Sequence, residues 1–197
     1  MRKVVLVLII QFTVLSCSFP SYIFNNNAQT TGVDYTNGKW LLNQIDAPVD
    51  IKDKLTKLAL DDFSERLKER VSYIPDTRGL LIPQKTAFNP NKSVLINLKK
   101  GTNYDYFINI KAAQTRNDFG ALDITPHNFN NGGENTNEVT IEIYDLNNLQ
   151  IIYSQKVTAT VGRPKDNQDV HLSKTSNSLI VSAYKKLIKD IDKRSIH

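Results

Sequence analysis

The stretch 139–161 constrains the fold more than any other part of the chain. Apolar residues occupy every second position over 139–143, with polar or amphipathic residues between them. The same alternation begins again at Ile151, after a turn at 147–148, and runs to Val161. Because successive side chains of a strand point to opposite faces of a sheet, each run buries one face and exposes the other. The sequence therefore predicts a long antiparallel hairpin with one buried face.

Two longer stretches carry apolar residues at helical spacing. In the first, Asp50 is the predicted N-cap, and the pattern ends near Lys68. The second begins near Ser176, and its apolar residues cover about half of the helix circumference. The other half carries four lysines, which we call the lysine face: Lys185, Lys186, Lys189 and Lys193.

Shorter elements complete the pattern. Buried strands are predicted over 40–45, 71–74 and 104–113. A short helix is predicted from Asn91 to Gly101, where a left-handed C-terminal residue is expected. The element order is therefore β-α-β-α-β-β-β-α. The predicted fold is α/β (α+β-like): a single domain with a mixed β-sheet and helices packed on one face.

The first residues of the chain have the layout of a secretory signal peptide. Arg2-Lys3 gives a positive start, an apolar run follows over 4–14, and Leu15-Ser16-Cys17 closes the segment. The run is too short for a transmembrane helix, which needs about 20 residues. A cysteine in place of the usual cleavage site resembles a bacterial lipobox, in which the sulfur receives a diacylglyceryl group. We expect residues 1–16 to be removed and Cys17 to carry a lipid; a signal peptide with a chance cysteine is the alternative.

The rest of the chain divides into two parts. Residues 17–38 are expected to form a flexible polar tether, since Asn, Gln, Thr and Gly dominate its second half. At its base, 22–24 would either rest among lipid headgroups or dock on the domain. Residues 39–197 suit one globular domain with a substantial core. The chain has one cysteine, and the lipid would use it, so the domain is expected to be stable without a disulfide.

The signal peptide and the spread of charge together argue against a nucleic-acid partner. The formal net charge is +5, and loss of Arg2 and Lys3 with the signal peptide would lower it by two, to +3. The positive residues are spread along the chain, which does not suit a nucleic-acid interface.

Ser18 follows Cys17 where Asp would signal retention in the inner membrane. This favours the outer membrane, with the domain facing the periplasm.

Two short motifs resemble those of a set of envelope lipoproteins. One is the helix that ends at Gly101 together with 104–108, and the other is the hairpin formed by 142–146 and 150–154. They are similar to motifs of the lipoproteins that share the domain of the curli secretion channel CsgG, the penicillin-binding-protein activator LpoB and the amino-terminal domain of TolB. The resemblance implies an envelope binding or assembly module without catalysis. A channel is not expected, because the predicted loop 118–137 is polar and lacks the alternation of membrane-spanning strands.

No motif in the sequence names a reaction. The chain contains no nucleophile elbow, phosphate-binding loop, metalloprotease helix or cysteine pair. His127 stands near several acids in the predicted loop, but without EF-hand spacing or a second histidine we expect no metal site. His171 and Asp169 have no spacing that brings their side chains together. We therefore predict no catalytic residue and no cofactor beyond the covalent lipid on Cys17.

The lysine face is the predicted partner-binding surface, because its charges could meet an acidic partner or anionic headgroups. A merely solvated face is the alternative. Together, the lysine face and the lipid anchor predict a non-enzymatic adaptor or accessory module of an envelope assembly, transport or cell-wall system. Its partner would be an envelope protein. Two other functions stay open. One is a periplasmic, hydrolase-like enzyme that uses His127 or His171, and the other is a surface-exposed lipoprotein with a host-facing role.

Overall fold

The computed structural model describes residues 19–25, 32–79, 82–83, 85–117, 134–162 and 175–196. Within them, the main sheet has six strands in the order β1-β7-β6-β5-β3-β4. Their bounds are β1 (Ser21–Asn25), β3 (Trp40–Leu42), β4 (Val71–Tyr73), β5 (Tyr106–Asn117), β6 (Glu134–Asp145) and β7 (Gln150–Gly162). The α-helices are α2 (Val49–Leu67), α3 (Lys92–Thr102) and α4 (Ser176–Arg194). A separate parallel pair is formed by β2 (Val33–Asp34) and β8 (Ser195–Ile196), and two 3₁₀ turns flank β4, at Lys68–Arg70 and Ile74–Asp76.

The main sheet is mixed, as predicted. Strands β5, β6, β7 and β1 pair antiparallel, while β3 pairs in parallel with both β5 and β4. From residue 40 onward the elements follow one another as β3-α2-β4-α3-β5-β6-β7-α4. This is the predicted order β-α-β-α-β-β-β-α, and the single domain of α/β (α+β-like) class is confirmed.

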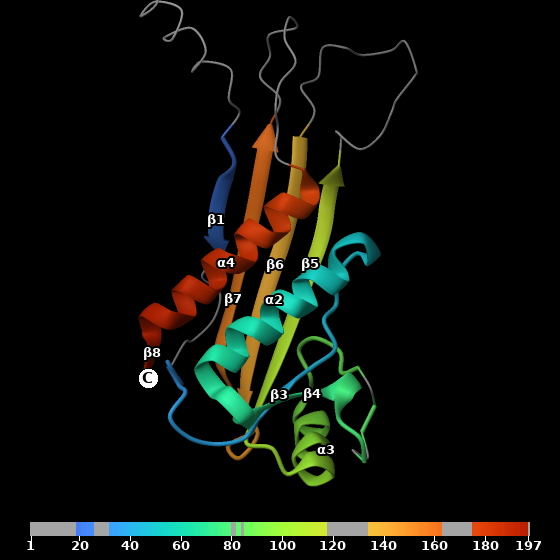
Figure 1. Cartoon of the computed structure of the whole chain (residues 1–197), viewed down its shortest axis with the longest axis vertical. Coiled ribbons are helices and arrows are strands. Elements are labelled where there is room, and N and C mark those ends of the chain that lie inside the picture. The colour runs from blue at the N-terminus through green and yellow to red at the C-terminus, as the bar shows by residue number, and fades with distance from the viewer. Residues whose placement is uncertain are drawn as a thin grey trace, which may run out of the picture.

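The two long helices, α2 and α4, lie over one face of the sheet, as Figure 1 shows. Both have a buried face at helical spacing. In α2 the buried residues are Ile51, Leu55, Ala59, Phe63 and Leu67, and in α4 they are Leu179, Ile180, Ala183, Tyr184, Leu187, Ile188 and Ile191. These side chains meet the apolar face of β5, β6 and β7 in the main core. The prediction that the helices pack on one face holds for these two long helices but not for the short helix α3.

The short helix α3 packs on the opposite face of the sheet. Its Leu95 and Leu98 lie in a smaller cluster with Leu41, Phe107 and Tyr144. Along β3 and β5, Leu41 and Phe107 alternate with residues of the main core, so the smaller cluster faces away from α2 and α4. Strands β3 and β5 are apolar on both faces at this end of the sheet, and α3 covers the second face.

The predicted hairpin is formed by β6 and β7. Its register shifts once, because Ile143 pairs with Tyr153 and Tyr144 pairs with Ile151, which leaves Ile152 as the extra residue of a bulge. The bulge turns Ile151 toward the smaller cluster, while Ile152 and Tyr153 both lie in the main core. The alternating pattern placed Ile151 and Tyr153 on the same face, which is wrong because the bulge interrupts the alternation.

Part of the stretch predicted as a tether belongs to the fold. Strand β1 pairs with β7 along its whole length. Val33 of β2 and Tyr35 after it are buried in the main core. Of the two alternatives for 22–24, the structure shows docking on the domain. The stretch 17–38 therefore contributes β1 and β2 to the fold, because β7 and β8 supply the hydrogen bonds that a short strand cannot make alone.

Two helix ends differ from the prediction. The N-cap of α2 is Pro48, and Asp50 lies in the first turn, where its charge suits the positive end of the helix. Helix α3 begins as predicted, with the Asn91 Oδ1 accepting a backbone hydrogen bond of 3.0 Å. The left-handed residue after α3 is Asn103, with φ of 56°, whereas Gly101 is still helical.

Candidate functional site

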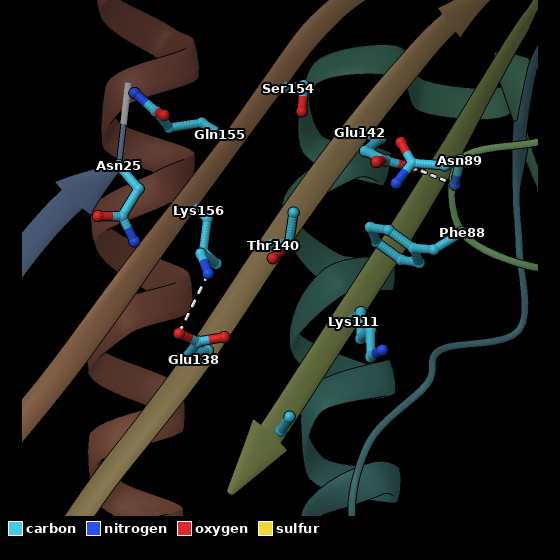
Figure 2. A pocket seen from close by; sticks show the side chains of 11 residues that line it. Asn25, Phe88, Asn89, Lys111, Glu138, Thr140, Glu142, Ser154, Gln155 and Lys156 are labelled. Carbon is cyan, nitrogen blue, oxygen red and sulfur yellow. Dashed lines mark hydrogen bonds and ion pairs between the residues drawn. The ribbon is translucent and has the colours of Figure 1, made fainter. Parts of the chain in front are cut away.

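The face of the sheet that the long helices leave uncovered carries a polar groove (Figure 2). The groove has a volume of about 460 Å³ and lies across β5, β6 and β7. Phe88 and Asn89 form one side of it, from the loop before α3. The other lining residues are mostly charged or polar: Asn25, Lys111, Ala113, Glu138, Thr140, Glu142, Ser154, Gln155 and Lys156.

Glu142 is the buried acid of the polar groove, with 3% of its surface exposed. Its Oε2 accepts a hydrogen bond from the Tyr144 hydroxyl at 2.8 Å and another from the backbone N–H of Asn89 at 3.3 Å. Burial raises the pKa of the Glu142 carboxyl above its ordinary value of 4.5, and the two hydrogen bonds oppose part of that rise. Among the described residues, no lysine or arginine forms an ion pair with Glu142.

The remaining charges of the polar groove are more exposed. Lys156 Nζ donates to Glu138 Oε1 at 3.1 Å, and the Thr158 hydroxyl lies 3.4 Å from the same oxygen. Lys111 is exposed and has no ion pair within the described part of the chain. The groove thus places hydrogen-bond donors and acceptors beside apolar surface of nearly equal extent, which suits a ligand with both polar and apolar groups.

Buried asparagines hold the loop beside the polar groove. Asn43 Nδ2 donates to the Thr86 carbonyl at 2.7 Å and to Asn109 Oδ1 at 2.9 Å. The Thr86 N–H donates back to Asn43 Oδ1 at 3.1 Å, and Asn109 Nδ2 donates to the Ala87 carbonyl at 3.2 Å. Both asparagines are 1% exposed, so these hydrogen bonds form away from competing water. They fix the backbone that carries Phe88.

Three of the four residues of the lysine face surround one hollow. This lysine groove has a volume of about 390 Å³. Its lining consists of Phe24, Gln155, Lys186, Lys189, Asp190, Lys193 and Arg194. Lys185 is exposed on the same helix but does not line the groove. The structure therefore brings Lys186, Lys189 and Lys193 together and separates Lys185 from them.

The lysine groove keeps an excess of positive charge. Its acid, Asp190, accepts a hydrogen bond from Arg194 Nε at 3.3 Å, so the two charges offset each other. Lys186 Nζ stands 4.6 Å from the centre of the Tyr22 ring, which is a cation–π contact. None of the three groove lysines has an ion pair with a described residue. Their ammonium groups are placed to receive an anionic ligand.

Cys17, the predicted site of the lipid, lies outside the described residues, as do His127 and His171, the two histidines of the enzyme alternative. The same is true of 118–133 in the predicted loop, while 134–137 belong to β6. Where the structure describes the chain, no three residues among His, Cys, Asp and Glu are grouped to hold a metal ion. No helix among the described residues is both long enough and apolar enough to span a membrane.

The sequence alone missed the polar groove and one wall of the lysine groove. The alternation indicated that Glu142 points away from the core, but its burial depends on the loop at Asn89, which has no periodicity. Phe24 belongs to β1, and the only signal for that strand was the aromatic and β-branched run Tyr22-Ile23-Phe24.

Comparison with solved structures finds several chains of similar fold at low identity, whereas no protein-family model and no curated protein matches the chain. The PelC dodecamer from Paraburkholderia phytofirmans is 13% identical, with a TM-score of 0.49, and the match covers 91% of this chain and 100% of PelC. Lipoprotein GNA1162 from Neisseria meningitidis is 12% identical, with a TM-score of 0.42, over 78% of this chain and 99% of GNA1162. Protein XCC0632 from Xanthomonas campestris is 13% identical, with a TM-score of 0.39, over 84% of this chain and 86% of XCC0632. Likenesses of this degree identify neither a family nor an activity.

Proposed function

We propose that the chain is a lipid-anchored protein of the outer membrane, whose domain faces the periplasm and acts as a non-enzymatic binding or accessory module. It would serve an envelope assembly, transport or cell-wall system, with an envelope protein as its partner. The observation that carries the proposal is the lysine groove. Three ammonium groups without a carboxylate partner among the described residues lie beside β1, the strand that leads back to Cys17.

The proposed lipid on Cys17 would hold the domain against its membrane. Ser21, the first residue of β1, stands four positions after Cys17. Because a chain extends by at most about 3.6 Å per residue, β1 begins within about 14 Å of the cysteine. One acyl chain binds a bilayer only marginally, whereas two or more anchor a protein stably. A diacylated cysteine would therefore keep the domain on the membrane surface.

The proposal groups the chain with the lipoproteins that share the domain of CsgG, LpoB and TolB. The two motifs that resemble theirs occupy the junction between α3 and β5 and the hairpin of β6 and β7. Proteins of one fold often differ in function. The resemblance therefore supports a role in the envelope and does not indicate a particular partner.

A hydrolase-like enzyme is the second candidate, and Glu142 is the observation that favours it. A carboxyl with a raised pKa in a groove is a common feature of acid–base sites. The variants His127→Ala, His171→Ala and Glu142→Gln test this candidate in cells. If the protein is an enzyme that depends on one of these groups, cells with that variant should lose the phenotype that the wild-type protein confers. If it is a binding module, cells with any of the three variants should keep that phenotype. Protease treatment of intact cells tests the host-facing alternative, because only a surface-exposed domain is digested.

Two measurements on cells test the leading proposal. Radiolabelled palmitate should label the wild-type protein and leave Cys17→Ser unlabelled. A photocrosslinking residue at Lys189 should give a discrete adduct with one envelope protein, while the same residue at Lys185 serves as the matched control outside the groove. An unlabelled wild type contradicts the anchor, and diffuse adducts of equal strength at both positions contradict the binding module.

A further inference from the structure

The lysine groove borders a free edge of the main sheet. Strand β1 is the first strand in the sheet order and pairs only with β7. Within the described part of the chain, no strand pairs with its outer edge, where every second backbone N–H and C=O points away from β7. Such an edge is a template for another extended chain.

The two faces of β1 differ in chemistry. Tyr22 packs against the main core, and Phe24 lines the lysine groove, so both point toward α4. Asn25 lines the polar groove, and its Nδ2 donates to Thr158 Oγ1 at 3.1 Å, so the alternate residues point to the other face. On that face Ile23 is 59% exposed. An added strand would therefore meet lysines on one side and an exposed isoleucine on the other.

We propose that β1 and the lysine groove together dock an extended acidic segment of a partner protein, which adds a strand beside β1. Its backbone would hydrogen-bond to the free edge, as in other cases of strand addition. Acidic side chains at every second position would reach Lys186, Lys189 and Lys193, and apolar side chains between them would lie beside Ile23. This inference rests on the proposed binding function and names the chemistry of its partner.

Charge distinguishes this occupant from a second copy of the chain. Two β1 strands that pair antiparallel in one continuous sheet are related by a twofold axis perpendicular to that sheet. This axis would place both α4 helices on the same face, with their groove lysines facing each other across the junction. Like charges at close range disfavour such pairing. An acidic strand brings the opposite charge to the same position.

The lysines have one other physical explanation. Charged residues, lysine above all, commonly protect edge strands from pairing with other chains. A protected edge should reject every strand, whereas a docking edge should select strands by their charge pattern. A binding experiment with defined peptides separates the two explanations.

The probe is a capped peptide of alternating glutamate and valine, titrated into the full-length protein in detergent and followed by calorimetry. One control peptide has the same composition with its glutamates and valines in separate blocks. A second control carries N-methyl groups on alternate residues, so that it cannot hydrogen-bond to an edge. We expect the alternating peptide to bind and both controls to bind at least about tenfold more weakly, because they lose charge-assisted or backbone hydrogen bonds.

The matched variants are Lys189→Glu inside the groove and Lys185→Glu outside it. Each changes the net charge equally on an exposed position of α4, and circular dichroism verifies that both fold. Lys189→Glu should weaken binding of the alternating peptide at least about tenfold, while Lys185→Glu changes it less than about twofold.

Three results would overturn the inference. Equal binding of the block peptide, with equal loss in both variants, means diffuse electrostatic attraction. No binding of any peptide means that the lysines protect the edge. A concentration-dependent dimer that the alternating peptide does not dissociate means that a second copy occupies β1. In each case palmitate labelling of Cys17 still tests the anchor separately, so failure here is distinguishable from failure of the proposed function.

Discussion

Arg66 of α2 and Asp192 of α4 form a bidentate ion pair. The Arg66 Nε donates to Asp192 Oδ1 and the Nη2 donates to Oδ2, each at 2.7 Å. The side chains are 14% and 33% exposed, so water weakens the pair less than it weakens an ion pair at the surface. The two long helices that cover the main core are thus joined by a geometrically specific contact.

Replacing Asp192 with Ala should destabilise the domain by about 2 kcal/mol, because a partly buried guanidinium loses two charge-assisted hydrogen bonds. Urea unfolding followed by circular dichroism measures the loss. The control is Lys85→Ala, which removes an ion pair with Asp46 whose side chains are 46% and 42% exposed. That variant should lose less than about 1 kcal/mol. Equal losses would mean that the Arg66–Asp192 pair acts as an ordinary surface pair.

Position 38 requires glycine for two reasons: its backbone is left-handed, and the Tyr106 ring approaches it closely. Its φ is 82°, and a Cβ at this position would lie 2.6 Å from Cε2 of Tyr106. Tyr106 in turn stacks on Trp40, with ring centres 4.2 Å apart. Gly38→Ala should therefore destabilise the domain by about 2 to 3 kcal/mol, from backbone strain plus displacement of the tyrosine ring.

Gly79→Ala separates these two effects. Gly79 has a similar φ of 81°, but apart from its chain neighbours no atom of the described residues lies within 4 Å of the position of its added Cβ. This variant should cost only about 1 kcal/mol, the strain of a left-handed alanine. The near-ultraviolet circular dichroism of Trp40, the one tryptophan of the chain, should change in Gly38→Ala and stay as in wild type in Gly79→Ala. Equal losses of stability and equal spectral changes in the two variants would show that the close approach of Tyr106 does not contribute to the effect of Gly38→Ala.

The predictable part of the fold is the part with strong periodicity. Helices α2 and α4 and the hairpin of β6 and β7 each bury a regular face, so their sequences carry the 3.6- or two-residue repeat. Strand β1 carries too few residues to show such a repeat, and its place depends on hydrogen bonds from β7. The bulge at Ile152 likewise arises from pairing between strands and leaves no repeat in either strand alone.

The candidate site likewise has one part that the sequence predicts and one part that it does not. The lysine face followed from the helical repeat of α4, because charged residues occupy the half that the core does not use. That Lys186 and Lys189 share a groove while Lys185 does not depends on Phe24, a residue distant in sequence. The polar groove depends on the buried Asn43 and Asn109, whose partners are backbone groups of a loop without a pattern.

The left-handed conformation at the end of α3 can be tested with three substitutions that differ in their expected effect on stability. Asn103 has φ of 56°, so Asn103→Ala should destabilise the domain by about 1 kcal/mol, while Asn103→Gly should be neutral or slightly stabilising. Gly101 is helical, so Gly101→Ala should stabilise by up to about 1 kcal/mol. Thermal unfolding measures all three. A loss in Gly101→Ala would assign the left-handed role to Gly101 instead.

The loop beside the polar groove should open when Asn43 is replaced. Asn43→Ala removes three hydrogen bonds and leaves the N–H and C=O of Thr86 buried without their partner, at a cost of about 2 to 3 kcal/mol. Trypsin cleavage after Lys85 under native conditions should become faster. Thr86→Ser is the control, because the hydrogen bonds between Asn43 and Thr86 go to the backbone of Thr86. An unchanged cleavage rate in Asn43→Ala would mean that other contacts hold the loop.

Glu142 should make the stability of the domain depend on pH. Burial raises the pKa of its carboxyl in the folded state above the ordinary 4.5 of the unfolded chain. Between these two values the folded state binds more protons than the unfolded state, so the free energy of unfolding falls as pH rises. Glu142 therefore contributes stability below pH 4.5 that is lost as pH rises through the pKa of the folded state.

Glu142→Gln removes this dependence, because the amide stays neutral while its Oε1 can still accept from Tyr144 and Asn89. The variant should be more stable than wild type at pH 7, by on the order of 1 kcal/mol, and the difference should shrink toward acidic pH. Urea unfolding between pH 4 and pH 8 measures it. Glu138→Gln is the control: it loses the contact with Lys156 and should be slightly less stable at pH 7. A difference between Glu142→Gln and wild type that does not change with pH would show that the charge of Glu142 costs the fold nothing, because water entering from the polar groove solvates the carboxylate.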